Sequence, residues 1–316
     1  MDKVKKFFKK IPLILWAILL LVVIFSLKSD RYFTLRNLVT LMQQGAALLI
    51  VASAASFIII SGGLDLSLGA ILTVSGITTA LCVNAGLPII VAVVAGALTG
   101  FICGSVNGLL ISYCHLPPFI TTLGTQGVFY GVALLLTGNE GIVIYNEKFL
   151  LLGATLNRYI PMAFICCGLL YVAIILIQDR TRFGRYLYAI GGNNEGARLS
   201  GINTAFWKFF VYAFAGLITG LAAVVLTSRL EVADPLVGTK WEFEAIACAI
   251  LGGVSMNIGK GDVKGTILGV ALITIVRSGM NVIRVPSIWQ PAILGTVMIL
   301  AIVFQVRMQL MEEKKA

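Results

Sequence analysis

Long apolar runs separated by short polar segments recur along the whole chain, and they limit its possible folds more than any other feature. The run IPLILWAILLLVVIFSL at residues 11–27 is the first of them. A helix of about 20 mostly apolar residues crosses the hydrocarbon layer of a bilayer. The chain is 59% hydrophobic and 12% charged, with a mean hydropathy of +0.97, which is outside the range of soluble domains. We therefore predict an all-α, polytopic membrane protein.

Scanning the sequence for such runs predicts about ten spans, several of them short or interrupted by glycine. They lie at residues 11–27, 45–62, 66–83, 87–112, 118–136, 160–178, 209–227, 245–257, 265–283 and 289–306. No polar segment between them is long enough to fold separately, so residues 1–316 are expected to form a single transmembrane domain. No small-residue cleavage site follows the first run, which is therefore expected to be an uncleaved span.

The positive charge of the chain follows the expected spans. With ten crossings and a cytoplasmic amino terminus, 15 Lys and Arg residues fall in cytoplasmic segments and 8 in external ones. This bias predicts that both termini are cytoplasmic, and it explains the net charge of +10 without a nucleic-acid partner. The external segment 28–44 runs against the trend, and its apolar spacing predicts a helix lying on the membrane interface.

The stretch ISGGLDLSLG places Asp65 between glycines inside an apolar region. A charge at the bilayer centre costs about 2.5 to 3.5 kcal/mol, so such a residue faces protein or water. The glycines allow the backbone to break, and a break exposes peptide groups that lipid cannot satisfy. We favour a capping role, in which Asp65 accepts the amide of Leu68 or Gly69. Direct contact with a transported solute is the alternative.

Two segments of the chain are similar to each other. Residues 58–72, IIISGGLDLSLGAIL, and residues 248–268, CAILGGVSMNIGKGDVKGTIL, each contain an apolar run, a GG pair, a polar break and a second apolar run. Transporters are often built from repeats whose interrupted helices flank the substrate path. Glycine-rich membrane segments also resemble one another by chance, and both readings stay open.

The longest polar segment, residues 179–208, is expected to be cytoplasmic. Its stretch NNEGARLSG predicts a small helix that Asn193 or Asn194 caps, with Glu195 in the first turn. Such an exposed helix has little of its own chain to pack against. It therefore indicates a protein partner, and an ordinary solvated loop is the alternative.

Four strings in this order and spacing resemble a known family. They are ISGGLDLSLG, LPPFITTLGT (116–125), TRFGRYLYAIGGNNEGARLSGIN (181–203) and EFEAIACAILGG (242–253). Together they closely resemble the membrane permease subunits of ribose-type monosaccharide importers of the ATP-binding cassette class, a family that also includes branched-chain amino acid permeases.

The resemblance implies a permease in the bacterial inner membrane that is not an enzyme and binds no cofactor. ATP would be bound by a cytoplasmic ATPase subunit, a periplasmic protein would deliver the sugar, and a second permease chain, identical or related, would complete the path. The expected path residues are Asp65, Ser67, Asn107, Thr121, Thr122, Gln126, Glu244 and Asn281. The residues expected to couple to the ATPase are Arg185, Gly191, Gly192, Asn193, Glu195, Ala197, Leu199 and Gly201.

The polar path residues also have a plainer role, because each can hydrogen-bond a neighbouring helix.

Three departures from the family pattern stand out. Glu244 replaces an Asp, the segment 256–258 is bulkier than usual, and Arg277 lies inside a span. Arg277 is expected either to pair with Asp65 or Glu244 or to extend to the membrane surface.

Two other functions compete with the permease. An ion-driven secondary transporter would use Asp65 and Glu244 as ion sites. A membrane enzyme would need a cluster of acids or histidines at one face, and the acids between Glu231 and Glu244 are interrupted and lack a histidine. GKGDVKG at 259–265 lacks the spacing of a phosphate-binding loop, so ATP hydrolysis by this chain is not expected. No catalytic or metal-binding residue is predicted.

Overall fold

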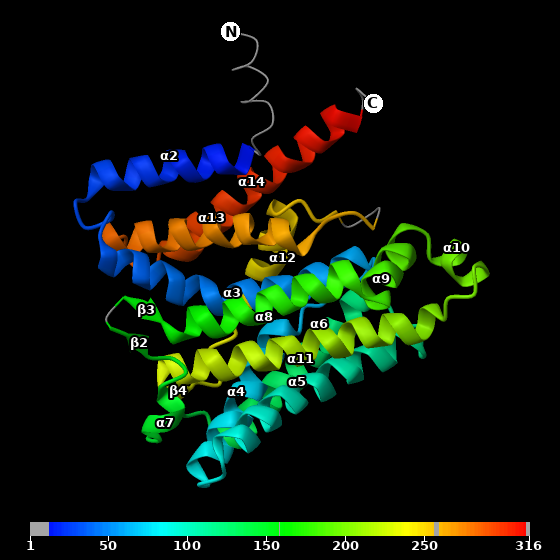
Figure 1. The fold of residues 1–316 in the computed structure, drawn as a ribbon, viewed down its shortest axis with the longest axis horizontal. Coiled ribbons are helices and arrows are strands. Elements are labelled where there is room, and N and C mark those ends of the chain that lie inside the picture. The colour runs from blue at the N-terminus through cyan, green and yellow to red at the C-terminus, as the bar shows by residue number, and fades with distance from the viewer. Residues whose placement is uncertain (1–12, 158, 256–258, 314–316) are drawn as a thin grey trace.

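The structure, a computed structural model, describes residues 13–157, 159–255 and 259–313, and this part of the chain is mostly helical (Figure 1). The main helices are α2 (Leu13–Lys28), α3 (Leu35–Ile60), α4 (Leu68–Asn84), α5 (Ile89–Ser112), α6 (Pro118–Thr137), α8 (Met162–Arg180), α11 (Thr204–Leu230), α12 (Trp241–Leu251), α13 (Val263–Val282) and α14 (Gln290–Glu313). One of these helices occupies each expected span. Six of them are long and apolar enough to cross a membrane, namely α3, α5, α6, α8, α11 and α13. The prediction of an all-α, polytopic membrane protein is confirmed at this level.

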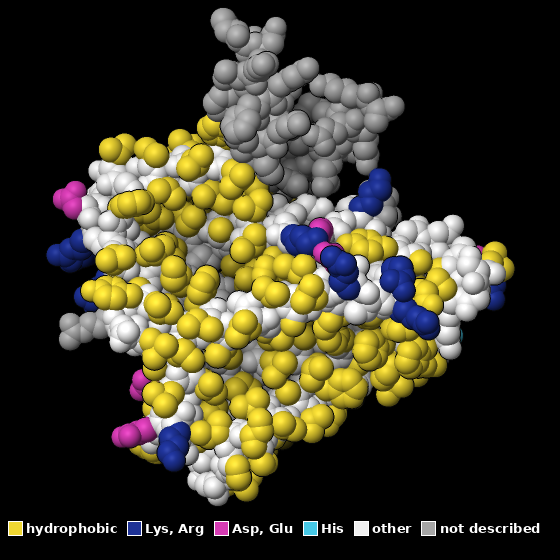
Figure 2. All heavy atoms as spheres, in the orientation of Figure 1, with side chains coloured by type: hydrophobic (Ala, Val, Ile, Leu, Met, Phe, Trp, Pro, Cys, Tyr) yellow, Lys and Arg dark blue, Asp and Glu magenta, His cyan; other side chains and the backbone are white. Residues whose placement is uncertain are grey.

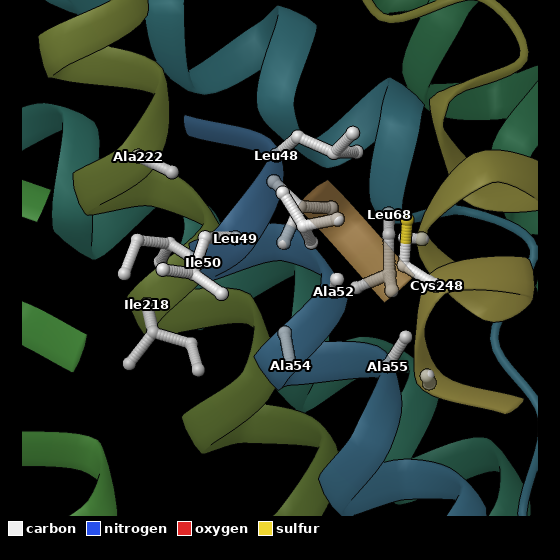
Figure 3. Packing of buried hydrophobic residues seen from close by; sticks show 14 of the residues in the cluster. Leu48, Leu49, Ile50, Ala52, Ala54, Ala55, Leu68, Ile218, Ala222 and Cys248 are labelled. Atoms are coloured by element: carbon white, nitrogen blue, oxygen red, sulfur yellow. The ribbon is translucent and has the colours of Figure 1, made fainter. Parts of the chain in front are cut away.

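Helix α3 lies at the centre of the bundle. Every residue from Ala46 to Ile60 is buried, because the helix is apolar on all sides and packs on α8, α11, α12 and α13. Figure 3 shows its Leu48, Ile50 and Ala52 among side chains of other helices. Ile218 and Ala222 come from α11 and Cys248 from α12.

The prediction of a separate interfacial helix at residues 28–44 is wrong. Helix α3 begins at Leu35, where the Thr34 side chain accepts the Asn37 amide at 3.3 Å, and it continues to Ile60. The physical reason is Asn37, which is buried and binds protein groups on two sides. Its Nδ2 donates to the Tyr32 carbonyl at 2.8 Å, and its Oδ1 accepts from the Ser278 hydroxyl at 2.7 Å. Asn37 therefore attaches the first turn of α3 to the protein, although Leu35 and Leu38 beside it are exposed.

Helices α5 and α11 approach each other more closely than side chains would allow. Glycines recur at every fourth position of α5, namely Gly96, Gly100, Gly104 and Gly108. Gly100 and Gly104 lie against Gly216 of α11, Gly108 lies against Phe209 of α11, and Gly96 lies against Thr79 of α4. A Cβ atom at any of the four would overlap an atom of another helix. Small residues at this spacing let helix backbones touch inside a membrane.

The two ends of the bundle differ. One end carries α7 (Glu147–Leu150) and two antiparallel strand pairs, β1 (Ile142–Val143) with β4 (Val232–Ala233) and β2 (Thr155–Leu156) with β3 (Ile160–Pro161). The other end carries α9 (Arg182–Gly192) and α10 (Asn194–Leu199), as Figure 1 shows. On the face that Figure 2 shows, hydrophobic side chains cover most of the surface, and the charged side chains lie in a few groups. This distribution fits a protein surrounded by lipid.

Candidate functional site

The turn between α3 and α4 is the first part of the candidate site. Helix α3 ends in a Schellman motif, in which the Gly63 amide reaches the Ile58 carbonyl at 2.9 Å and Gly62 adopts a φ of 80°. A side chain at Gly62 would strain this left-handed conformation. The chain then passes through Asp65 before α4 begins at Leu68. The backbone is therefore broken where the sequence predicts it.

Asp65 is only 2% exposed, and its carboxylate is held by nearby donors. Its Oδ1 accepts both the amide and the hydroxyl of Ser67, each at 2.7 Å. The predicted cap on Leu68 or Gly69 is wrong, because the carboxylate accepts hydrogen bonds from Ser67, two residues later in the chain, and from Asn107. Asp65 therefore stabilises the turn before α4 instead of the first turn of α4.

A polar cluster surrounds this turn, and we define it as Asp65, Ser67, Asn107, Thr122 and Thr125. Asn107 of α5 is its centre: Nδ2 donates to the Ser67 hydroxyl at 2.7 Å and to Asp65 Oδ2 at 3.3 Å. Its Oδ1 accepts from the Thr125 hydroxyl of α6 at 2.7 Å, and the Thr122 hydroxyl accepts the Leu66 amide at 3.1 Å. The cluster joins α5 and α6 to the turn before α4. Thr125 was not predicted, although its i+3 spacing from Thr122 places it on the same helix face.

Helix α12 supplies a second acidic region. Glu242 is 2% exposed, and its Oε1 accepts from Gln126 Nε2 of α6 at 2.8 Å. Glu244 forms an ion pair with Arg277 of α13. Arg277 therefore pairs with Glu244 and neither pairs with Asp65 nor extends to the membrane surface. Among the described residues, the second oxygen of each glutamate has no partner. Glu242 is not among the predicted path residues.

Four predicted path residues lie outside the polar cluster: Gln126 and Glu244 belong to the acidic region of α12, and Thr121 and Asn281 lie apart from both. Thr121 is 7% exposed and donates its hydroxyl to the Pro117 carbonyl at 2.9 Å, within its own helix. Asn281 is exposed near the end of α13 and accepts from Gln290 Nε2 at 3.0 Å. Thr121 makes the local bond that hydroxyls in a span commonly make, and Asn281 bonds the first residue of α14. The structure therefore brings Asp65, Ser67, Asn107 and Thr122 together and leaves the other four outside.

The two similar segments of the sequence end their first helices alike. At the end of α12, the Val254 amide reaches the Ala249 carbonyl at 3.1 Å, as the Gly63 amide reaches the Ile58 carbonyl at the end of α3. Gly253 has a φ of 93° and corresponds to Gly62. Before α13, Asp262 Oδ1 accepts the Lys264 amide at 2.8 Å, two residues on, as Asp65 accepts Ser67. Residues 256–258 lie outside the described residues. The sequence similarity thus corresponds to a shared local geometry.

The segment expected to couple to a partner forms two helices instead of one. Helix α9, which was not predicted, is amphipathic and buries Phe183, Leu187 and Ile190 against the bundle. The short α10 follows, and Asn193 caps it by accepting the Gly196 amide at 2.8 Å.

The eight predicted coupling residues differ in exposure. Ala197 is buried and Gly191 is half-buried. The exposed ones are Arg185, Gly192, Asn193, Glu195, Leu199 and Gly201. Arg198 donates two hydrogen bonds to Glu195, at 2.6 and 3.0 Å, and these bonds lower the pKa of the Glu195 carboxyl. The helix therefore presents an ionised pair beside the exposed Leu199.

Comparison with known proteins identifies the family. The family described as the permease component of branched-chain amino acid transport systems matches residues 37–302. The ribose import permease protein RbsC of Bacillus subtilis (strain 168) is 36% identical over 288 residues, covering 90% of this chain and 89% of that protein. The D-allose transport system permease protein AlsC of Escherichia coli (strain K12) is 35% identical, covering 90% of this chain and 87% of that protein.

A third relative covers slightly more of the chain. The autoinducer 2 import system permease protein LsrC of Yersinia enterocolitica is 31% identical over 300 residues, covering 95% of this chain and 83% of that protein. The match to the family, at residues 37–302, extends from the central helix α3 through the polar cluster and α9–α10 into α14. The chain is a multi-pass membrane protein that belongs to the family of permease components typified by branched-chain amino acid transport systems.

Proposed function

We propose that the chain is the transmembrane subunit of an ATP-driven importer and forms the path for a monosaccharide. The observation that carries this proposal is the buried polar cluster at the break between α3 and α4. Lipid satisfies neither a broken backbone nor a carboxylate, so this region faces protein or a polar solute. The similarity to ribose and allose permeases supports a sugar as that solute.

The proposed topology has ten spans and two cytoplasmic termini, with α9 and α10 on the cytoplasmic side. The excess of Lys and Arg on that side supports it. Residues 1–12 and 314–316, which carry part of this charge, lie outside the described residues. The end with α7 and the short strands then faces the periplasm, where a binding protein delivers the sugar.

Three partners follow from this arrangement. A cytoplasmic ATPase would contact α10, whose Glu195 and Leu199 are exposed. A periplasmic binding protein would contact the end with α7. A second permease chain would cover α6, most of whose residues are not buried and which has open space beside Gly124 and Gly127. Glycines with open space let another helix approach closely.

A path for sugar needs contacts that are weak and dispersed, because a deep binding site would trap the solute. In the described conformation, Asp65 and Ser67 are hydrogen-bonded to each other and to Asn107. Movement of α5 and α6 away from the turn would free these groups for sugar hydroxyls. Alternating access would then arise from rigid-body movement that the ATPase drives at α10.

The experiment is to purify the tagged chain from its native membrane and identify the proteins that accompany it. Reconstituted vesicles containing this complex are then loaded with ATP, and binding proteins carrying ribose, allose or another monosaccharide are added outside. Sugar-dependent stimulation of ATP hydrolysis supports the proposal. Uphill transport by the permease chain alone, driven by an ion gradient without ATP, contradicts it and favours the ion-coupled transporter.

A further inference from the structure

Helix α9 contacts the end of α3 through a glycine. Gly191 lies directly against the carbonyl oxygen of Ile60, and a Cβ atom at Gly191 would overlap that oxygen. Ile60 is the last residue of α3, and the turn that contains Asp65 follows at once. The side of Gly191 that faces away from solvent therefore touches the backbone that leads to the polar cluster.

The same part of α9 also contacts the second interrupted segment. Gly259 adopts a φ of 56°, and a Cβ atom there would overlap the amide nitrogen of Gly192. The Tyr188 hydroxyl of α9 donates to the Gly261 carbonyl at 2.7 Å. Gly259 and Gly261 lie just before α13 begins at Val263. One short helix thus holds both of the similar segments.

Gln178, at the end of α8, completes this connection. It is 3% exposed, and its Nε2 donates to the Tyr188 hydroxyl, which in turn donates to Gly261. Its Oε1 accepts the Val263 amide at 3.2 Å. A buried amide with both ends hydrogen-bonded fixes the positions of the groups that it joins. α8, α9 and the start of α13 are therefore linked by named bonds and not only by apolar packing.

Gly191 and Tyr188 of α9 make contacts inside the protein, unlike the exposed residues of α10. α10 presents side chains to solvent, whereas Gly191 and Tyr188 reach inward to the backbone of two other helices. A push on α10 passes into α9, because the two helices share Asn193 as C-cap and N-cap. The packed contacts then transmit it, since packed interfaces move as units.

We propose that Tyr188 and Gly191 are positioning residues that transmit movement of α9 to the turn at Asp65 and to the start of α13. The inference rests on the proposed function, because it requires an ATPase that moves α10. It adds Tyr188 to the coupling residues and gives Gly191, which was expected to couple to the ATPase, an inward-facing role. Their role is to make import follow ATP hydrolysis, and they touch neither sugar nor ATP.

The first test is Tyr188→Phe, which removes one hydroxyl and keeps the ring. The matched control is Tyr113→Phe, because Tyr113 is exposed at the end of α5 and its hydroxyl makes no hydrogen bond to the described residues. Each complex with its ATPase is purified, and ATP hydrolysis and sugar import are measured in the same vesicles. Tyr188→Phe loses the hydrogen bonds to Gln178 and Gly261. We expect it to hydrolyse at least about two- to tenfold more ATP per sugar imported, because each hydrogen bond supports a factor of that size.

The second test is Gly191→Ala, which inserts a methyl group between α9 and the Ile60 carbonyl. Its control is Gly168→Ala in α8, where no other atom lies within 4 Å of the added carbon. We expect Gly191→Ala to uncouple hydrolysis from import while the ATPase still purifies with the complex. This variant keeps the proposal testable if Tyr188→Phe lowers the amount of complex.

A merely structural role would lower the melting temperature and the amount of complex without changing the ratio of ATP hydrolysed to sugar imported. An unchanged ratio in both Tyr188→Phe and Gly191→Ala therefore overturns the inference. The wild-type complex distinguishes this result from failure of the proposed function. If the wild type shows no sugar-stimulated hydrolysis, the proposed function fails as well; if it does and the variants match it, only the inference fails.

Discussion

Gly100 of α5 and Gly216 of α11 lie against each other, backbone to backbone. A Cβ atom at either residue would overlap the carbonyl oxygen of the other. The contact is reciprocal, so neither helix can carry a side chain there unless the pair separates. This close approach sets the position of α5, and with it the position of Asn107 at the centre of the polar cluster.

Replacing Gly216 by Ala is expected to destabilise the protein by about 1 to 3 kcal/mol, the usual cost of overpacking a tight interface. The added methyl group would push α11 away from α5. The measurement is the melting temperature of the purified protein in detergent. Gly168→Ala, with open space around the added carbon, is expected to change it little. Equal melting temperatures for the two variants would show that the α5–α11 contact is not tight.

Replacing Asp65 by Ala is expected to cost about 3 kcal/mol or more, because the Ser67 amide, the Ser67 hydroxyl and Asn107 would lose their buried acceptor. Asp65→Asn keeps one oxygen for Ser67 and is expected to cost less. Melting temperatures of both variants check the order, with the exposed Asp30→Asn as control.

Transport by Asp65→Asn distinguishes two roles of the carboxylate. If Asp65 only organises the turn, the variant imports sugar at nearly the wild-type rate at a temperature where it is folded. A wild-type melting temperature combined with lost import would instead show that the charge contacts the solute.

Breaking the ion pair between Arg277 and Glu244 is expected to cost about 3 to 5 kcal/mol, because either single change leaves a poorly solvated charge unpaired. Arg277→Met and Glu244→Leu are the two single variants. The double variant removes both charges and is expected to be more stable than either. Thermal melting of all four proteins checks this double-mutant cycle, and additive losses would contradict the pairing.

Charge reversal at α10 tests the proposed contact with the ATPase. Glu195→Arg places two positive charges together and is expected to abolish copurification of the ATPase. Combining it with Arg198→Glu restores the pair within the helix. Copurification should remain lost in this double variant if Glu195 itself contacts the ATPase. Recovery in the double variant would mean that the pair only stabilises α10.

The same pair predicts how α10 responds to pH. Hydrogen bonds from Arg198 lower the pKa of the folded Glu195 carboxyl below its value in an unfolded chain. The stabilising contribution is therefore fully present above the ordinary pKa of glutamate and is lost only as the pH falls through the lowered value. Copurification of the ATPase is expected to be constant between about pH 6 and pH 8. A fall within that interval would show that another group titrates at the contact.

Much of the site was predictable because its local signals are strong. The break at Gly62 and Gly63 follows from glycine's freedom at positive φ, and the Asn193 cap follows from side-chain chemistry at a helix start. The partner of Asp65 was predicted incorrectly, because an Asp before a helix can reach either the helix amides or the residue two positions on. Thr125 and Glu242 were missed because their partners Asn107 and Gln126 come from distant parts of the sequence.

The sequence by itself determined that this chain is a polytopic helical membrane protein, since apolar runs of span length leave the backbone no other way to satisfy its hydrogen bonds in lipid. It also determined the position of the break at Asp65 and the family. Only the tertiary structure decided that Arg277 pairs with Glu244, that Gly100 meets Gly216, and that α9 touches Ile60. Those contacts join residues far apart along the chain, and their pairing depends on which helices are neighbours, which no local pattern encodes.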